Sequence, residues 1–219
     1  VTIFAGVGLS MLIAAPIGAA ASQVGTLIMW ATEQAPLVMG ILVSVIVGVA
    51  LTLPISSAAI CAALGLTGLA GGAAVAGCCA QMVGFAVMSY KENGVGGLVS
   101  QGLGTSMLQM GNIIKNPRIW IAPTLASAIT GPLATCLFHF EMNGAAVSSG
   151  MGTCGLVGQI GVYTGWVSDI AAGTKAAITP MDWAAMVLLC FVLPAVLSVV
   201  FCEVERKLGW IKEGDLKLN

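Results

Sequence analysis

Residues Gln34–Tyr90, QAPLVMGILVSVIVGVALTLPISSAAICAALGLTGLAGGAAVAGCCAQMVGFAVMSY, form a long stretch without a single charged side chain. A helix needs about 20 apolar residues to cross the hydrocarbon core of a bilayer, so this stretch can hold two or three crossings. Its apolar residues come in long runs and lack the in/out alternation of membrane-barrel strands. The stretch therefore predicts membrane-spanning helices.

The rest of the chain has the same character. Of its 219 residues, 58% are apolar and 8% are charged, and the mean hydropathy is +1.01, whereas soluble domains carry about 25% charged residues. Further charge-free stretches are Val1–Thr32, Asn93–Ile114, Ile119–Phe140, Met142–Ser168 and Trp183–Cys202. This low charge and high hydropathy exclude an ordinary cytosolic enzyme and a disordered chain. A nucleic-acid binder is excluded because the net charge is −1 and there is no basic stripe.

The fold class that follows is an all-α integral membrane protein, with about 5–7 transmembrane helices plus one or two re-entrant or broken-helix segments. Clear spans are expected at Leu37–Leu53, Ile119–Phe138 and Trp183–Cys202. Ile55–Tyr90 predicts a short half-helix, a turn and a longer helix, and Gly94–Met110 predicts a re-entrant or interfacial segment. We expect one transmembrane domain over residues 1–202 and a charged tail over 203–219.

The basic residues suggest an orientation. Most of them flank Gly94–Met110 or follow the last span, and the positive-inside rule places all of these in the cytoplasm: Lys91, Lys115, Arg118, Arg206, Lys207, Lys212 and Lys217. The loop Asp169–Asp182 is then external, and residues 203–219 form a cytoplasmic C-terminal tail.

A weak internal repeat relates residues 37–90 to residues 119–166. The pattern Ser-x-Ile-x-Gly, followed by Thr four residues later, begins at Ser44 and again at Ser127, at a constant offset. Four matches can also arise by chance in this composition. Repeats with paired broken segments indicate the substrate site of a transporter.

The most informative polar stretch is Phe138-His139-Phe140-Glu141-Met142-Asn143. Ionisable residues within membrane segments are costly and mark functional sites by default. Glu141 offers acceptor oxygens and His139 can donate or accept, a mixture that suits sugar hydroxyls. The alternative is that both side chains lie at the outer interface and merely face water.

The glycine-rich run from Gly144 to Gly158 follows directly. Irregular backbone at membrane depth is tolerated where it lines a cavity or is buried in protein, so Ser149, Thr153 and Gln159 are candidate ligand contacts. Close packing through small residues is the competing interpretation. Ser56 and Ser57, at the equivalent place in the first repeat, either line the same cavity or cap the next helix.

Catalytic arrangements are missing from the sequence. We find no phosphate-binding loop, no Ser-His-Asp order and no zinc motif among seven cysteines and a single His, and we expect no cofactor. Whether the chain takes part in an enzymatic reaction stays open, because phosphoryl transfer would need separate partners.

About half of the chain resembles the membrane (IIC) component of the bacterial sugar phosphotransferase system, most of all the branch of the PfoR-type toxin regulators. The resemblance lies in Leu53–Ile60, in Asn116-Pro117-Arg118-Ile119-Trp120-Ile121-Ala122-Pro123 and its continuation to Pro132, in Glu141-Met142-Asn143 and in Gly150–Gln159. It implies a homodimer in the bacterial inner membrane that binds a sugar and works with separate IIA and IIB proteins. The His and the Glu of that family's ligand site correspond to His139 and Glu141.

These observations predict a sugar-binding permease whose partners are a sugar, the IIA and IIB proteins and the lipid bilayer, with no nucleic acid. The candidate substrate-binding residues are His139, Glu141, Asn143, Ser149, Thr153, Gln159, Ser56 and Ser57. Two other functions stay open: a membrane sensor that regulates through a partner, and a transporter or channel for an unrelated small solute.

Overall fold

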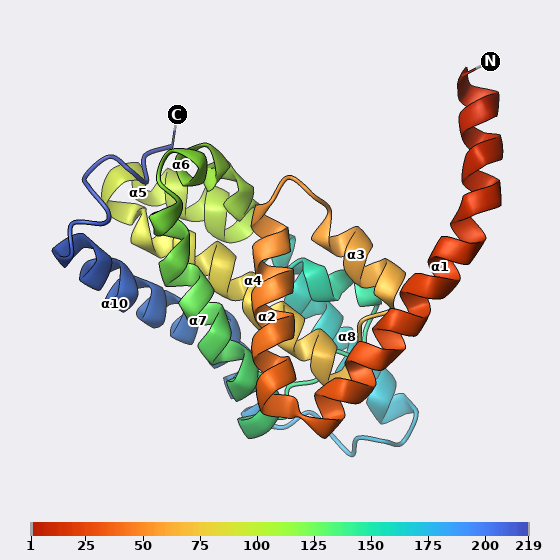
Figure 1. Cartoon of the computed structure of the whole chain (residues 1–219). Coiled ribbons are helices and arrows are strands. Elements are labelled where there is room, and N and C mark those ends of the chain that lie inside the picture. The colour runs from red at the N-terminus through yellow and green to blue at the C-terminus, as the bar shows by residue number, and fades with distance from the viewer. Residues whose placement is uncertain (1, 219) are drawn as a thin grey trace.

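The structure is a computed structural model that describes the backbone of residues 2–218 and the side chains of residues 18–218 (Figure 1). Within this part, the chain is helical, and its only β-type pairing is an isolated bridge between Gly68 and Met142. The α-helices are α1 (Thr2–Gln34), α2 (Pro36–Thr52), α3 (Ser57–Leu64), α4 (Gly68–Met88), α5 (Tyr90–Val99), α6 (Met110–Lys115), α7 (Ile121–Pro132), α8 (Val157–Ala171), α9 (Pro180–Val187) and α10 (Leu193–Lys207).

Short π-helical and 3-10 turns join several of these helices. The π turns are η1 (Ser100–Gly104), η4 (Leu133–Leu137) and η7 (Leu188–Val192), and the 3-10 turns are η2 (Ser106–Gln109), η3 (Pro117–Trp120), η5 (Ala146–Gly150) and η6 (Cys154–Leu156). With these turns included, the described residues contain three helices that are long and apolar enough to cross a membrane: Gly68–Met88, Pro117–Leu137 and Pro180–Lys207. The apolar α2 is shorter, and the total number of crossings stays a prediction.

The half-helix, turn and longer helix expected in Ile55–Tyr90 are confirmed as α3, Gly65 and α4. The Ser56 hydroxyl accepts a hydrogen bond from the Ala59 amide (3.1 Å) and so caps α3. Gly65 ends α3 in the left-handed conformation (φ +63°), which glycine adopts without a steric penalty.

Helix α4 lies at the centre and packs against α2, α7 and α10 (Figure 1). Small residues allow this close approach: a Cβ atom on Gly77 would lie 2.0 Å from the Ser44 carbonyl oxygen. Helices α2 and α7 run antiparallel, because the start of α2 meets η4, the turn that continues α7, where Thr135 Oγ1 donates to the Pro36 carbonyl (2.7 Å).

The two serines that begin the repeated pattern contact each other, with Ser44 Oγ donating to the Ser127 carbonyl (2.8 Å). Beyond this pair the two halves differ: α4 packs against both α2 and α7, whereas α8 packs mainly against η5. The internal repeat therefore stays a prediction.

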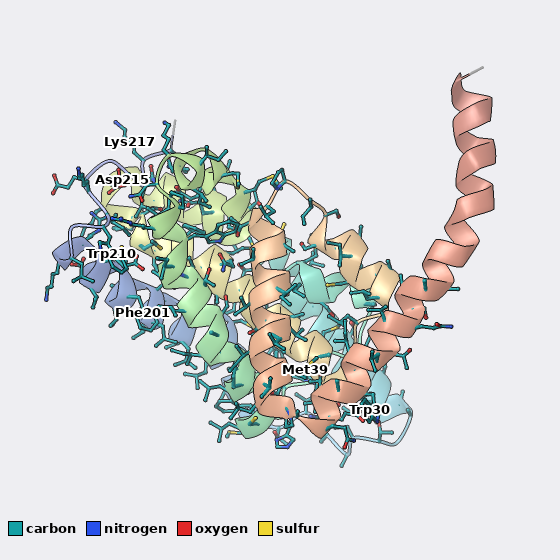
Figure 2. The ribbon with its side chains drawn as sticks, in the orientation of Figure 1. Trp30, Met39, Phe201, Trp210, Asp215 and Lys217 are labelled. Carbon is teal, nitrogen blue, oxygen red and sulfur yellow. The ribbon has the colours of Figure 1, made fainter. Side chains whose placement is uncertain are left out.

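The basic residues around α5 and α6 gather with the chain's C-terminal segment at one end of the molecule. Lys91 pairs with Glu203 (2.8 Å) and Arg206 pairs with Glu92 (3.0 Å). Helix α10 extends past Cys202 to Lys207, and the tail beyond it folds back along α5 and α6. Figure 2 shows Trp210, Asp215 and Lys217 at this end, with Trp30 at the opposite end.

Candidate functional site

A polar pocket of about 590 Å³ lies at the end of the molecule opposite the tail, where α7, α8 and α9 meet their connecting segments. It contains three of the eight predicted site residues, His139, Glu141 and Asn143. The full lining is Leu137, Phe138, His139, Phe140, Glu141, Asn143, Trp166, Asp169, Thr174, Lys175, Thr179, Met181, Asp182 and Ala185.

The first wall of the pocket is the non-helical segment 138–143, which is fixed on the N-terminal half of α4. Met142 and Gly68 exchange two backbone hydrogen bonds of 3.0 Å each. The Phe140 carbonyl lies so close to α4 that a Cβ atom on Gly72 would sit 1.6 Å from its oxygen. His139 has a positive φ of 44°, an uncommon backbone conformation for a residue other than glycine. Backbone contacts therefore position His139 and Glu141.

Asn143 joins this wall to α8. Its amide Nδ2 donates to Glu141 Oε2 (3.0 Å) and to Asp169 Oδ2 (2.9 Å), so one side chain holds two carboxylates. The backbone of Asn143 also lies against Gly165, where a Cβ atom would come within 2.8 Å of the Asn143 nitrogen. The small-residue pair Gly161 and Gly165 thus serves close packing, as its spacing indicates.

The third wall is the segment that leads into α9. Lys175 Nζ pairs with Asp182 Oδ1 (2.7 Å) and lies 5.5 Å from the centroid of the Trp166 ring. Asp182 also accepts from the Thr179 amide (2.7 Å) in a reciprocal capping box that starts α9. The ion pair and the cap together fix the loop above the pocket.

Sequence reasoning did not assign Asp169, Lys175 and Asp182 to the site. They lie in the segment interpreted as an external loop, and their relation to Asn143 depends on tertiary packing. One available signal was that this loop carries three charged residues in a chain with few, on the same predicted membrane face as Glu141.

The other five predicted residues lie outside the pocket and form hydrogen bonds elsewhere, although Gln159 Oε1 is buried with no partner among the described residues. Ser57 Oγ donates to the Gly150 carbonyl and Ser149 Oγ to the Leu66 carbonyl, at 2.7 Å each. Thr153 Oγ1 donates to the Gly102 carbonyl, and Gln159 Nε2 donates to Cys79 Sγ. Ser56 caps the start of α3. A role for them in ligand binding stays a prediction.

The pocket's chemistry suits a small, polar ligand rich in hydroxyl groups. Carboxylates accept hydrogen bonds, imidazole and ammonium groups donate them, and the exposed side chains of Leu137 and Met181 provide apolar surface against which a ring can pack. Its volume falls in the range of small-molecule sites. Among the described residues, no cluster of three or more His, Cys, Asp or Glu side chains could hold a metal ion.

Comparison with known protein families gives a match that covers nearly the whole sequence. Residues 1–218 match the family described as "Phosphotransferase system, EIIC". No similar curated protein and no similar solved structure was found. The match covers more of the chain than the motifs quoted above and agrees with its helical, apolar architecture. The chain therefore belongs to the EIIC family, the membrane component of the phosphotransferase system.

Proposed function

We propose that this EIIC protein is a sugar permease that binds its sugar in the pocket beside Asn143 and carries it inward for phosphorylation by a separate IIB partner. The observation that carries the proposal is the convergence of His139, Glu141 and Asn143 in one polar pocket of a chain that is otherwise strongly apolar. Ionisable groups are retained in such chains where function requires them.

Each side chain has a distinct role in this proposal. Glu141 is exposed to the pocket and accepts hydrogen bonds from sugar hydroxyls. Asn143 uses its amide nitrogen on the two carboxylates, which leaves its carbonyl oxygen to accept a further bond. Leu137 and Met181 are exposed side chains of the lining and provide apolar surface for the sugar ring.

The orientation of the molecule supports an outward-facing state. The pocket lies opposite the basic end that contains Lys91 and Arg206, and the positive-inside rule places that basic end in the cytoplasm. The pocket then opens toward the outside, where sugar is collected. We also propose a homodimer in the bacterial inner membrane, and a re-entrant arrangement of the broken segment between α7 and α8.

Ligand binding tests the site. Purified protein is titrated with a panel of sugars, and thermal stabilisation is compared between wild type and Glu141→Gln. Because hydrogen bonds to charged groups contribute about 1.5–3 kcal/mol, the substitution should weaken binding at least about tenfold without unfolding the protein. The matched control is Glu203→Gln, a carboxylate at the opposite end. Equal affinity in wild type and Glu141→Gln would place the site elsewhere.

Transport is tested separately. Vesicles that contain the protein should take up labelled sugar only when IIA, IIB and a phosphoryl donor are supplied. Uptake that needs no donor would instead indicate a transporter for an unrelated solute. Binding without any uptake would favour a membrane sensor.

A further inference from the structure

We infer that the preferred ligand of the pocket carries a positive charge beside its hydroxyl groups, as a protonated amino sugar does. The inference rests on the proposed function, because it names the class of sugar for that same pocket. It is carried by the balance of charges around the cavity, by the distance between two of its carboxylates and by the volume of the cavity.

The pocket holds more negative than positive charge. Its carboxylate and ammonium side chains are Glu141, Asp169, Lys175 and Asp182. Lys175 is committed to Asp182 at 2.7 Å, so this pair is neutral as a unit. Glu141 and Asp169 have no cationic partner in the part of the chain that the structure describes. Two negative charges therefore remain uncompensated.

These two charges are held near each other. Glu141 Oε2 and Asp169 Oδ2 both accept from Asn143 Nδ2, at 3.0 and 2.9 Å, so the two oxygens are less than about 6 Å apart. The Asn143 amide is neutral and links the carboxylates without cancelling their charge. An ammonium group placed beside them is attracted by both, whereas a carboxylate or phosphate is repelled by both.

The shape of the pocket favours an organic cation over a bare metal ion. Its volume of about 590 Å³ fits a small organic molecule. Trp166 is buried, and the Lys175 ammonium already lies 5.5 Å from the centroid of its ring, so the indole positions Lys175 beside the pocket. An amino sugar combines an ammonium group for the carboxylates with hydroxyls for the remaining polar groups of the pocket.

The test compares four probes that share one ring framework: D-glucosamine, N-acetyl-D-glucosamine, D-glucose and D-glucuronate. Each is titrated onto the purified full chain at about pH 6.5, where the amine is protonated, at low and high salt. D-glucosamine should bind at least about tenfold tighter than the two neutral sugars, and D-glucuronate weakest. The affinity advantage of D-glucosamine over the neutral sugars should shrink as the salt concentration rises, while the affinity of the neutral sugars stays constant.

Asp169→Asn tests the charge directly, because asparagine keeps an acceptor oxygen for Asn143 and removes only the charge. The affinity of D-glucosamine relative to that of D-glucose should fall about tenfold in this variant. The matched control is Asp215→Asn, a second carboxylate bonded to an asparagine amide (2.8 Å) but at the opposite end, and it should keep the full preference. If Asp169→Asn does not fold, the salt dependence of the wild type decides alone.

Each other outcome has a definite meaning. Equal binding of charged and neutral sugars, insensitive to salt, overturns the amino-sugar inference and leaves the proposed function standing. Displacement of D-glucosamine by millimolar Na⁺ or Ca²⁺, with no requirement for a sugar ring, overturns it in favour of an inorganic cation site. If none of a broad sugar panel binds, the proposed function itself fails.

Discussion

Replacing Gly72 by alanine tests how the pocket is positioned. The new Cβ atom would lie 1.6 Å from the Phe140 carbonyl oxygen, whereas real Cβ contacts are essentially never closer than 3.0 Å. The segment 138–143 must therefore move by at least about 1.4 Å, the difference between the two distances. Such a shift breaks the paired Gly68–Met142 hydrogen bonds and displaces His139 and Glu141 from their present places.

The expected change in the free energy of unfolding is the sum of two destabilising effects and one stabilising effect. The two backbone hydrogen bonds contribute about 1–3 kcal/mol together, and overpacking a closely packed interior costs about 1–3 kcal/mol. Alanine is favoured over glycine inside a helix by about 0.5–1 kcal/mol, which offsets part of the loss. Gly72→Ala should therefore lower the free energy of unfolding by about 3 kcal/mol and weaken ligand binding at least tenfold.

The assay is thermal unfolding in detergent, combined with hydrogen exchange of the amides in 138–143. The control is Gly96→Ala, a helical, exposed glycine with no atom within 4 Å of the added Cβ, which should be neutral or slightly stabilising. If Gly72→Ala is as stable as Gly96→Ala, and exchange in the segment is unchanged, the idea that this backbone contact positions the pocket is refuted.

Two further substitutions test other contacts. Glu92→Gln removes the negative charge that accepts hydrogen bonds from Arg206 (3.0 Å) and from the Leu216 amide (2.8 Å). The C-terminal tail should therefore detach at a cost of about 2 kcal/mol and be cleaved faster by trypsin. Unchanged proteolysis would show that other contacts hold the tail. Gln81→Leu removes the buried oxygen that accepts from the indole N–H of the half-buried Trp120 (2.9 Å), and it should lower stability by about 1–3 kcal/mol in thermal unfolding. A wild-type midpoint would mean that the indole finds another acceptor.

The sequence pattern was sufficient for the helical fold, and it singled out three of the residues that line the candidate pocket. Charge-free runs predict the long helices because the bilayer requires apolar length, and Gly65 marks the break between α3 and α4. His139, Glu141 and Asn143 stood out because polar groups are rare in such a chain. Asp169 could not be assigned, because its place beside Asn143 arises from packing between segments far apart in the sequence.

The glycine-rich run after Asn143 shows why the rest of the site could not be predicted. A missing Cβ atom allows close approach of either a ligand or another part of the chain, and the sequence is the same in both cases. In the structure the neighbour is protein: a Cβ on Gly150 would lie 2.5 Å from the Ser57 carbonyl, and one on Gly161 would lie 2.3 Å from Ser148 Cβ. The pattern indicated irregular, tightly approached backbone, and only the fold shows what approaches it.

The backbone contacts that position the pocket also hold two of its carboxylates close together. Gly72→Ala and Asp169→Asn should therefore have different effects on stability. Backbone contacts at Gly72 and Gly165 hold Glu141 and Asp169 close together, although like charges at this distance repel. Gly72→Ala relaxes the backbone, so both stability and binding should fall. Asp169→Asn removes the repulsion and keeps the backbone, so the unliganded protein should be at least as stable as wild type while it loses the preference for a cation. A bound cation offsets the same repulsion and should therefore raise the stability of the wild type more than that of Asp169→Asn.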